Sequence, residues 1–203
     1  MENEIFPIYE NHVNCHRVDH VKQVIAKSLD LVKQIKDEKI NIDMVYAVAA
    51  YHDIGLVEDR KTHHIIGARK LIEDKNLDAF FTTEQKKIMA EAIEDHRASL
   101  DGHPRNIYGK IVSSADRHWK LDEALCVMYR YRLKHNPDFT IDQIIDDAFN
   151  HVVDKFGANG YAHKTLYFKD KDYEKLITQL NDLTQNKDKF KRKFLEVNSF
   201  NSI

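Results

Sequence analysis

Histidine and aspartate residues recur in the N-terminal part of the chain at positions from which they could bind metal ions. His52 and Asp53 are adjacent, follow the apolar stretch Met44 to Tyr51 and precede Gly55. Imidazole and carboxylate groups are costly to bury unless a charge or a hydrogen bond compensates them. Their place beside an alanine- and valine-rich segment therefore indicates a metal inside a helical bundle. Further candidate ligands lie in or at the ends of neighbouring predicted helices: His20, His63, His96 and Asp116.

These candidate ligands come from separate predicted helices, and helical bundles build metal sites from side chains that face one another across helices. Imidazole and carboxylate ligands suit first-row transition metals such as Fe, Mn or Zn. Six ligands are too many for one structural zinc, whereas two ions that share Asp53 would use them all. Taken alone, each residue is more often an ordinary surface or core residue. The ordered set on five successive apolar helices favours a metal centre.

The elements that must position these side chains are predicted to be helices, which makes the fold class all-α. The chain has only 6 Gly and 3 Pro, and its apolar residues recur at intervals of three and four. Asn41 and Thr62 are predicted N-caps, and Thr82 and Thr140 match the capping-box pattern. The predicted helices cover Val13 to Lys36, Met44 to Ile54, His63 to Glu73, Thr82 to His96, Pro104 to Leu133, Thr140 to Phe156, Tyr173 to Leu183 and Lys187 to Val197.

The composition limits the classes of partner. A chain of 203 residues with 42% hydrophobic residues can build one substantial core. A net charge of −2 gives no broad attraction to nucleic acid polymers or to membranes. The chain shows no signal-peptide pattern and no run of about 18 apolar residues. Its two cysteines lack a CxxC spacing. We therefore expect a soluble, cytoplasmic protein.

The order His, His-Asp, His, His, Asp resembles the HD superfamily of metal-dependent phosphohydrolases, over residues 12 to 125. The apolar residues that follow His20 favour it over His16 as the first ligand, and the spacing to Gly67 favours His63 over His64. Four stretches are similar to the motifs of that family: Ala47 to Gly55, Lys61 to Ala68, Ala92 to Arg97 and Ser113 to Asp116.

This resemblance implies an HD-type helical bundle as a catalytic core at residues 1–135. A C-terminal helical extension at 136–203 would pack on it to form a single globular unit. It also implies a binuclear centre of divalent transition metal ions such as Fe, Mn, Zn, Co or Ni. One ion would be held by His20, His52, Asp53 and Asp116, and the other by Asp53, His63 and His96. Hydroxide held between the ions would attack a small phosphate ester or nucleotide.

The same resemblance assigns further roles. Asp53 and Lys61 would be catalytic, and Lys61 would also contact the phosphate of the substrate. Arg97 and Arg117 are further candidate phosphate contacts, because they lie within a few residues of the candidate ligands. His16 is a candidate ligand for a third ion. The stretch Asp101 to Pro104 is shorter than the Asp-Gly-x-Gly-Tyr-Pro motif of the cyclic-dinucleotide phosphodiesterase branch and lacks its inner Gly-Tyr, which argues against that substrate. Two alternatives stay open: a di-iron oxygenase of the same fold, and a non-catalytic nucleotide-binding regulatory module.

Overall fold

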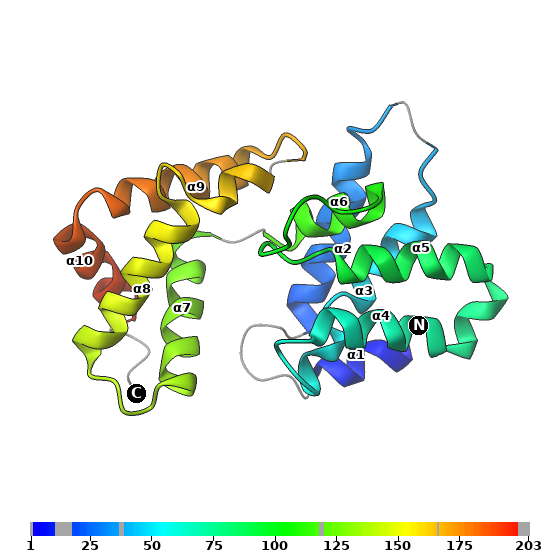
Figure 1. The fold of residues 1–203 in the computed structure, drawn as a ribbon, viewed down its shortest axis with the longest axis horizontal. Helices are drawn as coiled ribbons and strands as arrows, with labels where there is room; N and C mark the ends of the chain where they lie inside the picture. The colour runs from blue at the N-terminus through cyan, green and yellow to red at the C-terminus, as the bar shows by residue number, and fades with distance from the viewer. Residues whose placement is uncertain (1, 11–17, 37–38, 118–119, 166, 199–203) are drawn as a thin grey trace. The chain divides into compact units, whose positions relative to one another are not determined.

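The computed structural model describes residues 2–10, 18–36, 39–117, 120–165 and 167–198. The all-α prediction is confirmed, because these residues form α-helices and short 3-10 helices and contain no strand. They divide into two compact units, Met1–His118 and Trp119–Ile203 (Figure 1). None of the helices in the described ranges is long and apolar enough to cross a membrane.

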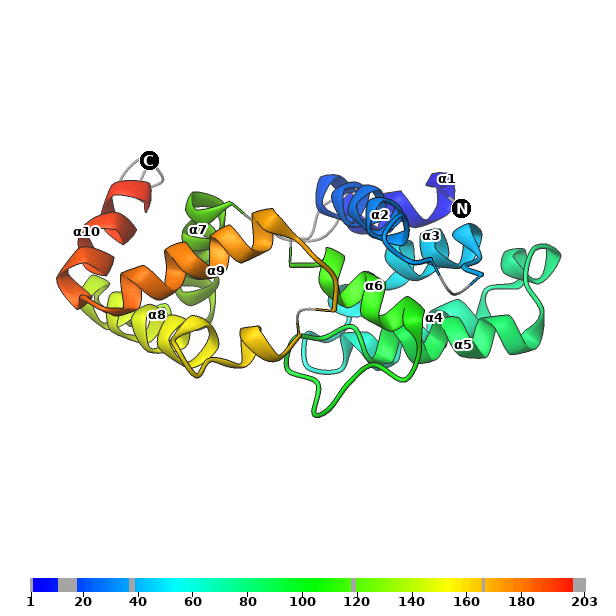
Figure 2. The same ribbon diagram turned by 90° about the horizontal axis from the view of Figure 1, so that it is seen from above.

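The first unit contains the candidate ligands. Its helix α3 lies against α2, α5 and α6, and α4 lies against α5 and the short helix η1 (Figure 2). Most residues of α3 are alanine, valine or other apolar residues and are buried, so neighbouring helices can approach it from several sides. The elements are α1 (Glu2–Glu10), α2 (Val18–Val32), α3 (Ile42–Tyr51), η1 (Ile54–Val57), α4 (His63–Glu73), η2 (Lys75–Ala79), α5 (Thr83–Glu94) and α6 (Ile107–Ala115).

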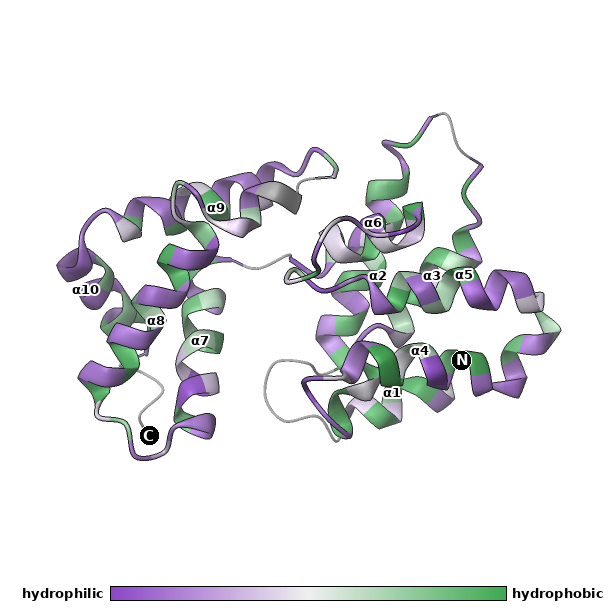
Figure 3. Ribbon diagram, viewed as in Figure 1, coloured by the Kyte–Doolittle hydropathy of each residue, from purple (hydrophilic) through white to green (hydrophobic). Residues whose placement is uncertain are grey.

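The second unit has an apolar core. Phe190 and Phe194 stack with their ring centroids 5.4 Å apart, and Tyr129 packs edge-on against Phe194. Figure 3 shows hydrophilic and hydrophobic residues alternating along the helices of both units, as expected for helices with one buried side. The elements are α7 (Leu121–His135), α8 (Ile141–Phe156), η3 (Tyr161–Thr165), α9 (Lys171–Thr184) and α10 (Lys187–Asn198).

Most predicted helix starts are confirmed. The Asn41 side chain accepts hydrogen bonds from the first turn of α3, and the capping boxes at Thr82 and Thr140 are both formed. Thr62 is the N-cap residue of α4, as predicted, but its side chain makes no capping hydrogen bond to that helix. Its hydroxyl donates instead to Asp59 Oδ2 at 2.6 Å, which closes the preceding turn. Helix α1 was not predicted.

The single long helix predicted from Pro104 to Leu133 is wrong. Helix α6 ends at Ala115 and α7 starts at Leu121, where the Glu123 carboxylate accepts a hydrogen bond from the Lys120 amide. The physical reason is burial, because the apolar residues of α6 are buried in the first unit and Leu125 belongs to the core of the second. Helix α7 packs on α8 and α10, so contacts divide the chain after residue 118 and not after 135. The packing of a C-terminal extension on the core stays a prediction.

Candidate metal centre

The six predicted ligands converge in the first unit. They form two groups in which the possible ligand atoms lie within 4.8 Å of one another, and Asp53 belongs to both. The first group contains His20, His52, Asp53 and Asp116, and the second contains Asp53, His63 and His96. Both groups have the membership that the sequence predicted. Asp116 is partly exposed and the others are buried.

Helix ends deliver most of these side chains. His52 ends α3 and Asp53 directly precedes η1, so the two adjacent residues lie where the chain turns between two helices. His63 is the first residue of α4. His96 and Asp116 follow the last turns of α5 and α6, whereas His20 lies in the first turn of α2. Because the helices end around one point, their terminal side chains meet there.

The distances in the first group centre on two carboxylates. His20 Nε2 lies 3.1 Å from Asp116 Oδ1 and 3.9 Å from Asp53 Oδ2. His52 Nε2 lies 3.6 Å and 3.4 Å from the same two oxygens. Two imidazole nitrogens thus face two carboxylate oxygens around one small volume.

The second group uses the other oxygen of Asp53. Asp53 Oδ1 lies 3.4 Å from His63 Nε2 and 3.7 Å from His96 Nε2, and these two nitrogens are 3.4 Å apart. The two oxygens of a single carboxylate therefore face different sets of histidines. This is the arrangement expected of a carboxylate that bridges two ions.

Backbone carbonyl groups fix the orientation of three of the imidazoles. In each case Nδ1 donates to the carbonyl oxygen three residues earlier: His52 to Ala49 at 2.7 Å, His63 to Arg60 at 2.7 Å and His96 to Ile93 at 2.6 Å. A carbonyl oxygen can only accept, so Nδ1 carries the hydrogen and Nε2 of the neutral ring presents a lone pair. The carbonyls of Ala49 and Ile93 lie in the last turns of α3 and α5, where carbonyl groups lack the regular partner four residues later in the helix.

This arrangement fits a bound cation. In the second group two imidazole lone pairs and a carboxylate oxygen converge, and acceptors that face one another repel without a positive charge between them. In the first group the buried His52 Nε2 has no hydrogen-bond partner among the described residues. Imidazole and carboxylate donors suit first-row transition metals, and the donor set therefore matches divalent metal ions.

The electrostatics of the site follow from burial and from the carboxylates. Burial lowers the pKa of His63 to about 4, so its ring is neutral at neutral pH and its lone pair is available. Burial also lowers the pKa of His52, but Asp53 and Asp116 outweigh this effect and raise the pKa well above its ordinary value. Burial raises the pKa of the Asp116 carboxyl, but the neighbouring His20 and His52 lower it by more. The pKa of Asp116 therefore lies well below its usual range. Protons would therefore compete with a cation chiefly at His52.

Two glycines allow the ligand-bearing segments to come close. A Cβ on Gly55 would collide with the carbonyl oxygen of His63 and lie 2.9 Å from its Cα. A Cβ on Gly67 would lie 2.9 Å from the carbonyl oxygen of Tyr51, beside His52. The Gly that follows His-Asp in the sequence is thus explained by its direct contact with the backbone of another ligand.

The predicted cationic residues have different surroundings. The exposed Lys61 side chain makes no hydrogen bond or ion pair within the described part of the chain. Arg97 is half-buried and donates through Nη1 to the carbonyl oxygen of Lys61 at 3.2 Å. Arg117 is buried and donates to Ser113 Oγ at 2.6 Å. Contact of these three residues with a substrate stays a prediction.

Two histidines close to the predicted ligands have no assigned place in either group. His16 lies outside the described residues, so its role in a third ion site stays a prediction. His64 is half-buried and its ring packs edge-on against that of His63, with centroids 5.5 Å apart.

Sequence analysis did not identify the carbonyl groups that orient the imidazoles or the hydrogen bond from the Tyr9 hydroxyl to the carbonyl oxygen of Ala50, at 2.9 Å. For His52 and His96, the position just after the end of a helix could have predicted a bond to the carbonyl three residues earlier. Nothing in the sequence indicated that Tyr9, in the unpredicted helix α1, bonds to the last turn of α3.

Comparison with known proteins gives one match. The family model of the HD domain matches residues 17–118, half of the chain, and this range contains all six candidate ligands. Neither the curated proteins nor the solved structures include a significant match. The matched range and the two His/Asp groups agree with each other, and the chain belongs to the HD domain family.

Proposed function

We propose that this protein is a metal-dependent phosphohydrolase that cleaves a small phosphate ester or a nucleotide. The observation that carries the proposal is the position of Asp53, whose two oxygens face two separate sets of histidines. Membership of the HD domain family supports it, because most members of that superfamily are metal-dependent phosphohydrolases. The proposed substrate carries a phosphate group, because the two metal ions held by these ligand groups would stabilise its negative charge.

The residues have distinct roles in this proposal. His20, His52 and Asp116 would hold one divalent ion, His63 and His96 the other, and Asp53 both. Two ions held there would make a shared water acidic enough to serve as a nucleophile near neutral pH and would neutralise charge on the phosphoryl group. The ions would be transition metals such as Fe, Mn, Zn, Co or Ni, as imidazole and carboxylate ligands favour.

Lys61 and Arg97 are the proposed phosphate ligands. Lys61 lies two residues before His63, and its ammonium group makes no contact that would hold it away from a substrate in the described part of the structure. The hydrogen bond from Arg97 to the carbonyl oxygen of Lys61 uses Nη1, which leaves further guanidinium donors next to His96 for an anion. Arg105 differs, because Asp95 and Glu94 occupy its donors.

Metal analysis combined with an assay of phosphate release from a panel of phosphate esters and nucleotides tests this function. The purified protein should contain up to two transition metal ions and release phosphate from at least one substrate. Asp53→Asn should reduce activity about 1000-fold, which corresponds to roughly 4 kcal/mol of transition-state stabilisation, and should lower the metal content. Asp43→Asn, an exposed change in α3, is the matched control and should keep both.

The other two functions predict different results in the same experiment. A di-iron oxygenase would consume oxygen when loaded with iron and would release no phosphate. A regulatory module would bind nucleotide without turnover. Either outcome, with full metal content, would contradict the proposed hydrolysis.

A further inference from the structure

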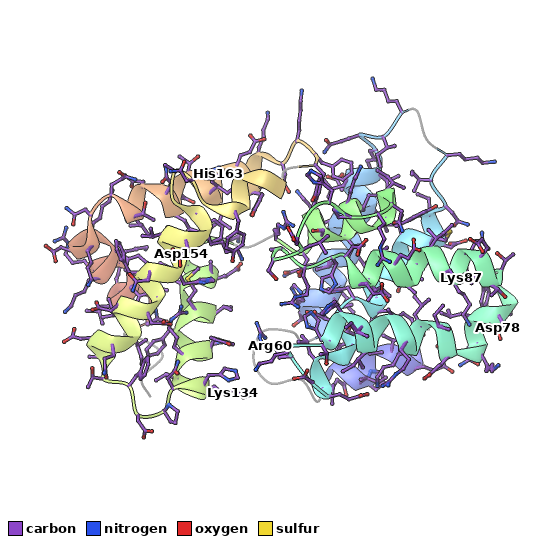
Figure 4. The ribbon with its side chains drawn as sticks, viewed as in Figure 1. Arg60, Asp78, Lys87, Lys134, Asp154 and His163 are labelled. Atoms are coloured by element: carbon purple, nitrogen blue, oxygen red, sulfur yellow. The ribbon has the colours of Figure 1, made fainter. Side chains whose placement is uncertain are left out.

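The second ligand group depends on a turn at the protein surface. His63 is oriented by the carbonyl of Arg60, which lies in the segment between η1 and α4. Residues 57–62 of this segment are exposed, and Figure 4 shows the Arg60 side chain extending outward from it. The first group is different, because His52 is oriented by a carbonyl of the buried helix α3. A movement of the surface turn would therefore affect His63 before it affected His52.

Local hydrogen bonds close this turn. Asp59 Oδ2 accepts from the amide of Thr62 at 2.9 Å and from its hydroxyl at 2.6 Å. The amides of Glu58 and Asp59 both donate to the carbonyl of Gly55. Glu58 also pairs with Arg69 and Lys70 of α4, but these ion pairs are exposed and contribute little. These bonds shape the turn but do not connect it to the segment that carries His96.

Arg97 makes that connection. It directly follows His96, and its Nη1 donates to the carbonyl oxygen of Lys61, which is the residue after Arg60. One side chain thus joins the segment that carries His96 to the turn that orients His63. The segment that carries His96 and Arg97 is itself held in place, because Asp95 is buried and accepts two hydrogen bonds from the Arg105 guanidinium, each 2.9 Å long.

We propose that Arg97 is a positioning residue for the second ion: by holding the turn at Lys61, it keeps His63 and His96 at the separation needed to bind a cation with Asp53. This proposal rests on the proposed two-ion centre and goes beyond the contact of Arg97 with substrate. Residues that orient metal ligands commonly change metal affinity 10- to 100-fold when they are removed.

The direction in which metal affinity changes when Arg97 is replaced distinguishes a positioning role from a purely electrostatic one. A guanidinium near a cation site repels the cation, so loss of its charge alone should strengthen metal binding. Loss of a positioning contact should weaken it. Substrate contact alone predicts no change in metal affinity when substrate is absent.

Calorimetry with Mn²⁺ on the full chain, without substrate, measures the affinity for each ion. Arg97→Met removes the charge and the hydrogen bond but keeps much of the side-chain volume. We expect the second Mn²⁺ to bind about 10-fold more weakly, or more weakly still, with the first unchanged. Arg60→Met is the matched control, because it removes a charge from the same turn and keeps the carbonyl that orients His63. This control should not weaken the binding of either ion.

A second variant removes a hydrogen bond within the turn itself. Thr62→Val has nearly the same shape and loses only the hydroxyl bond to Asp59. It should weaken the binding of the second Mn²⁺ about 5-fold, because the loss of one ordinary hydrogen bond changes an equilibrium constant by about that factor. Circular dichroism should show that both variants keep the helical fold of the wild-type protein.

The outcomes separate this proposal from the proposed function. If the wild-type protein binds two ions and Arg97→Met binds both equally well or better, Arg97 does not position the site, and the two-ion centre stands. If the wild-type protein binds fewer than two ions, the two-ion centre and the positioning role of Arg97 are both wrong, whereas the phosphate-release assay decides the proposed hydrolysis separately. Weaker binding of the second ion alone in Arg97→Met, with Arg60→Met unchanged, supports the positioning role.

Discussion

The two units of this protein bury polar side chains in different ways. In the second unit, buried donors bond to nearby carbonyl oxygens: Arg132 donates to the carbonyls of Met128 and Asp147, and the Asn198 amide nitrogen donates to that of Phe194. In the first unit, the ammonium group of Lys86 donates in the same manner to Asp78 and to the carbonyl of Asp74. The metal-ligand groups differ, because lone pairs and carboxylate oxygens face one another there.

This difference has a physical consequence. The second unit fills its interior with apolar contacts, and its buried donors Arg132 and Asn198 bond to carbonyl oxygens, so we expect its stability to be independent of an added ion. The first unit concentrates acceptors at one point, and burying such groups costs free energy until a cation compensates them. We therefore expect the stability of the two units to depend on different variables.

The largest expected effect on stability comes from a cavity in the second unit. Phe190 is fully buried against Phe194 and Phe149, and Phe190→Ala should lower the free energy of unfolding by about 4 kcal/mol. Chemical denaturation measures this loss, and Mn²⁺ calorimetry should show unchanged metal affinity. Phe80→Ala is the control, since Phe80 is 75% exposed and its loss should cost less than about 0.5 kcal/mol. A large loss of metal affinity in Phe190→Ala would mean that the units are not independent.

Removal of metal should have the next largest effect, in the first unit. An ion present at 100 times its dissociation constant stabilises the state that binds it by about 2.7 kcal/mol. Treatment with a chelator should therefore speed hydrogen exchange of the α3 amides and leave the amides of α8 unchanged. Equal changes in both helices, or none in α3, would contradict the assignment of ion-dependent stability to the first unit.

The smallest expected effect is a pH dependence in the second unit. Burial, together with the charges of Lys155 and Arg132, lowers the pKa of His151 from its ordinary value of 6.5 to about 4, against the opposing effects of Asp147 and Asp154. The unfolded chain then binds a proton more readily than the folded one. The stabilising contribution is present above pH 6.5 and is lost as the pH falls from 6.5 towards 4.

Denaturation of wild-type protein and of His151→Gln at pH 7 and pH 5 measures this contribution. Wild type should lose roughly 1 to 2 kcal/mol more than the variant between the two pH values, because the variant has no proton to bind at this position. Comparison of the two proteins removes the effect of the histidines in the first unit. Identical pH dependence in both would show that His151 titrates normally in the folded state.

Local sequence patterns were sufficient for much of the fold. The periodic apolar residues predicted most helices, and the Ser/Thr/Asn-type caps at Asn41, Thr82 and Thr140 marked helix starts because their side chains bond only to the next turn. The predictions from local patterns failed where residues outside the predicted helix competed for the same side chain or buried part of the helix elsewhere. The Thr62 side chain bonds to Asp59 instead of to the first turn of α4, and the region from Pro104 to Leu133 divides because its two halves are buried in different units.

The side-chain types identified His20, His52, Asp53, His63, His96 and Asp116 as candidate ligands, and the resemblance of their order and spacing to the HD superfamily implied which of them form each group. Only the tertiary structure decided the distances between these groups and the pairing of the nearby cationic side chains. Asp53 Oδ1 lies 3.4 Å from His63 Nε2, and Arg105 is paired with Asp95, whereas Lys61 makes no ion pair within the described part of the chain. These outcomes depend on where backbone groups and charges meet after folding, and no local pattern of residues encodes those distances.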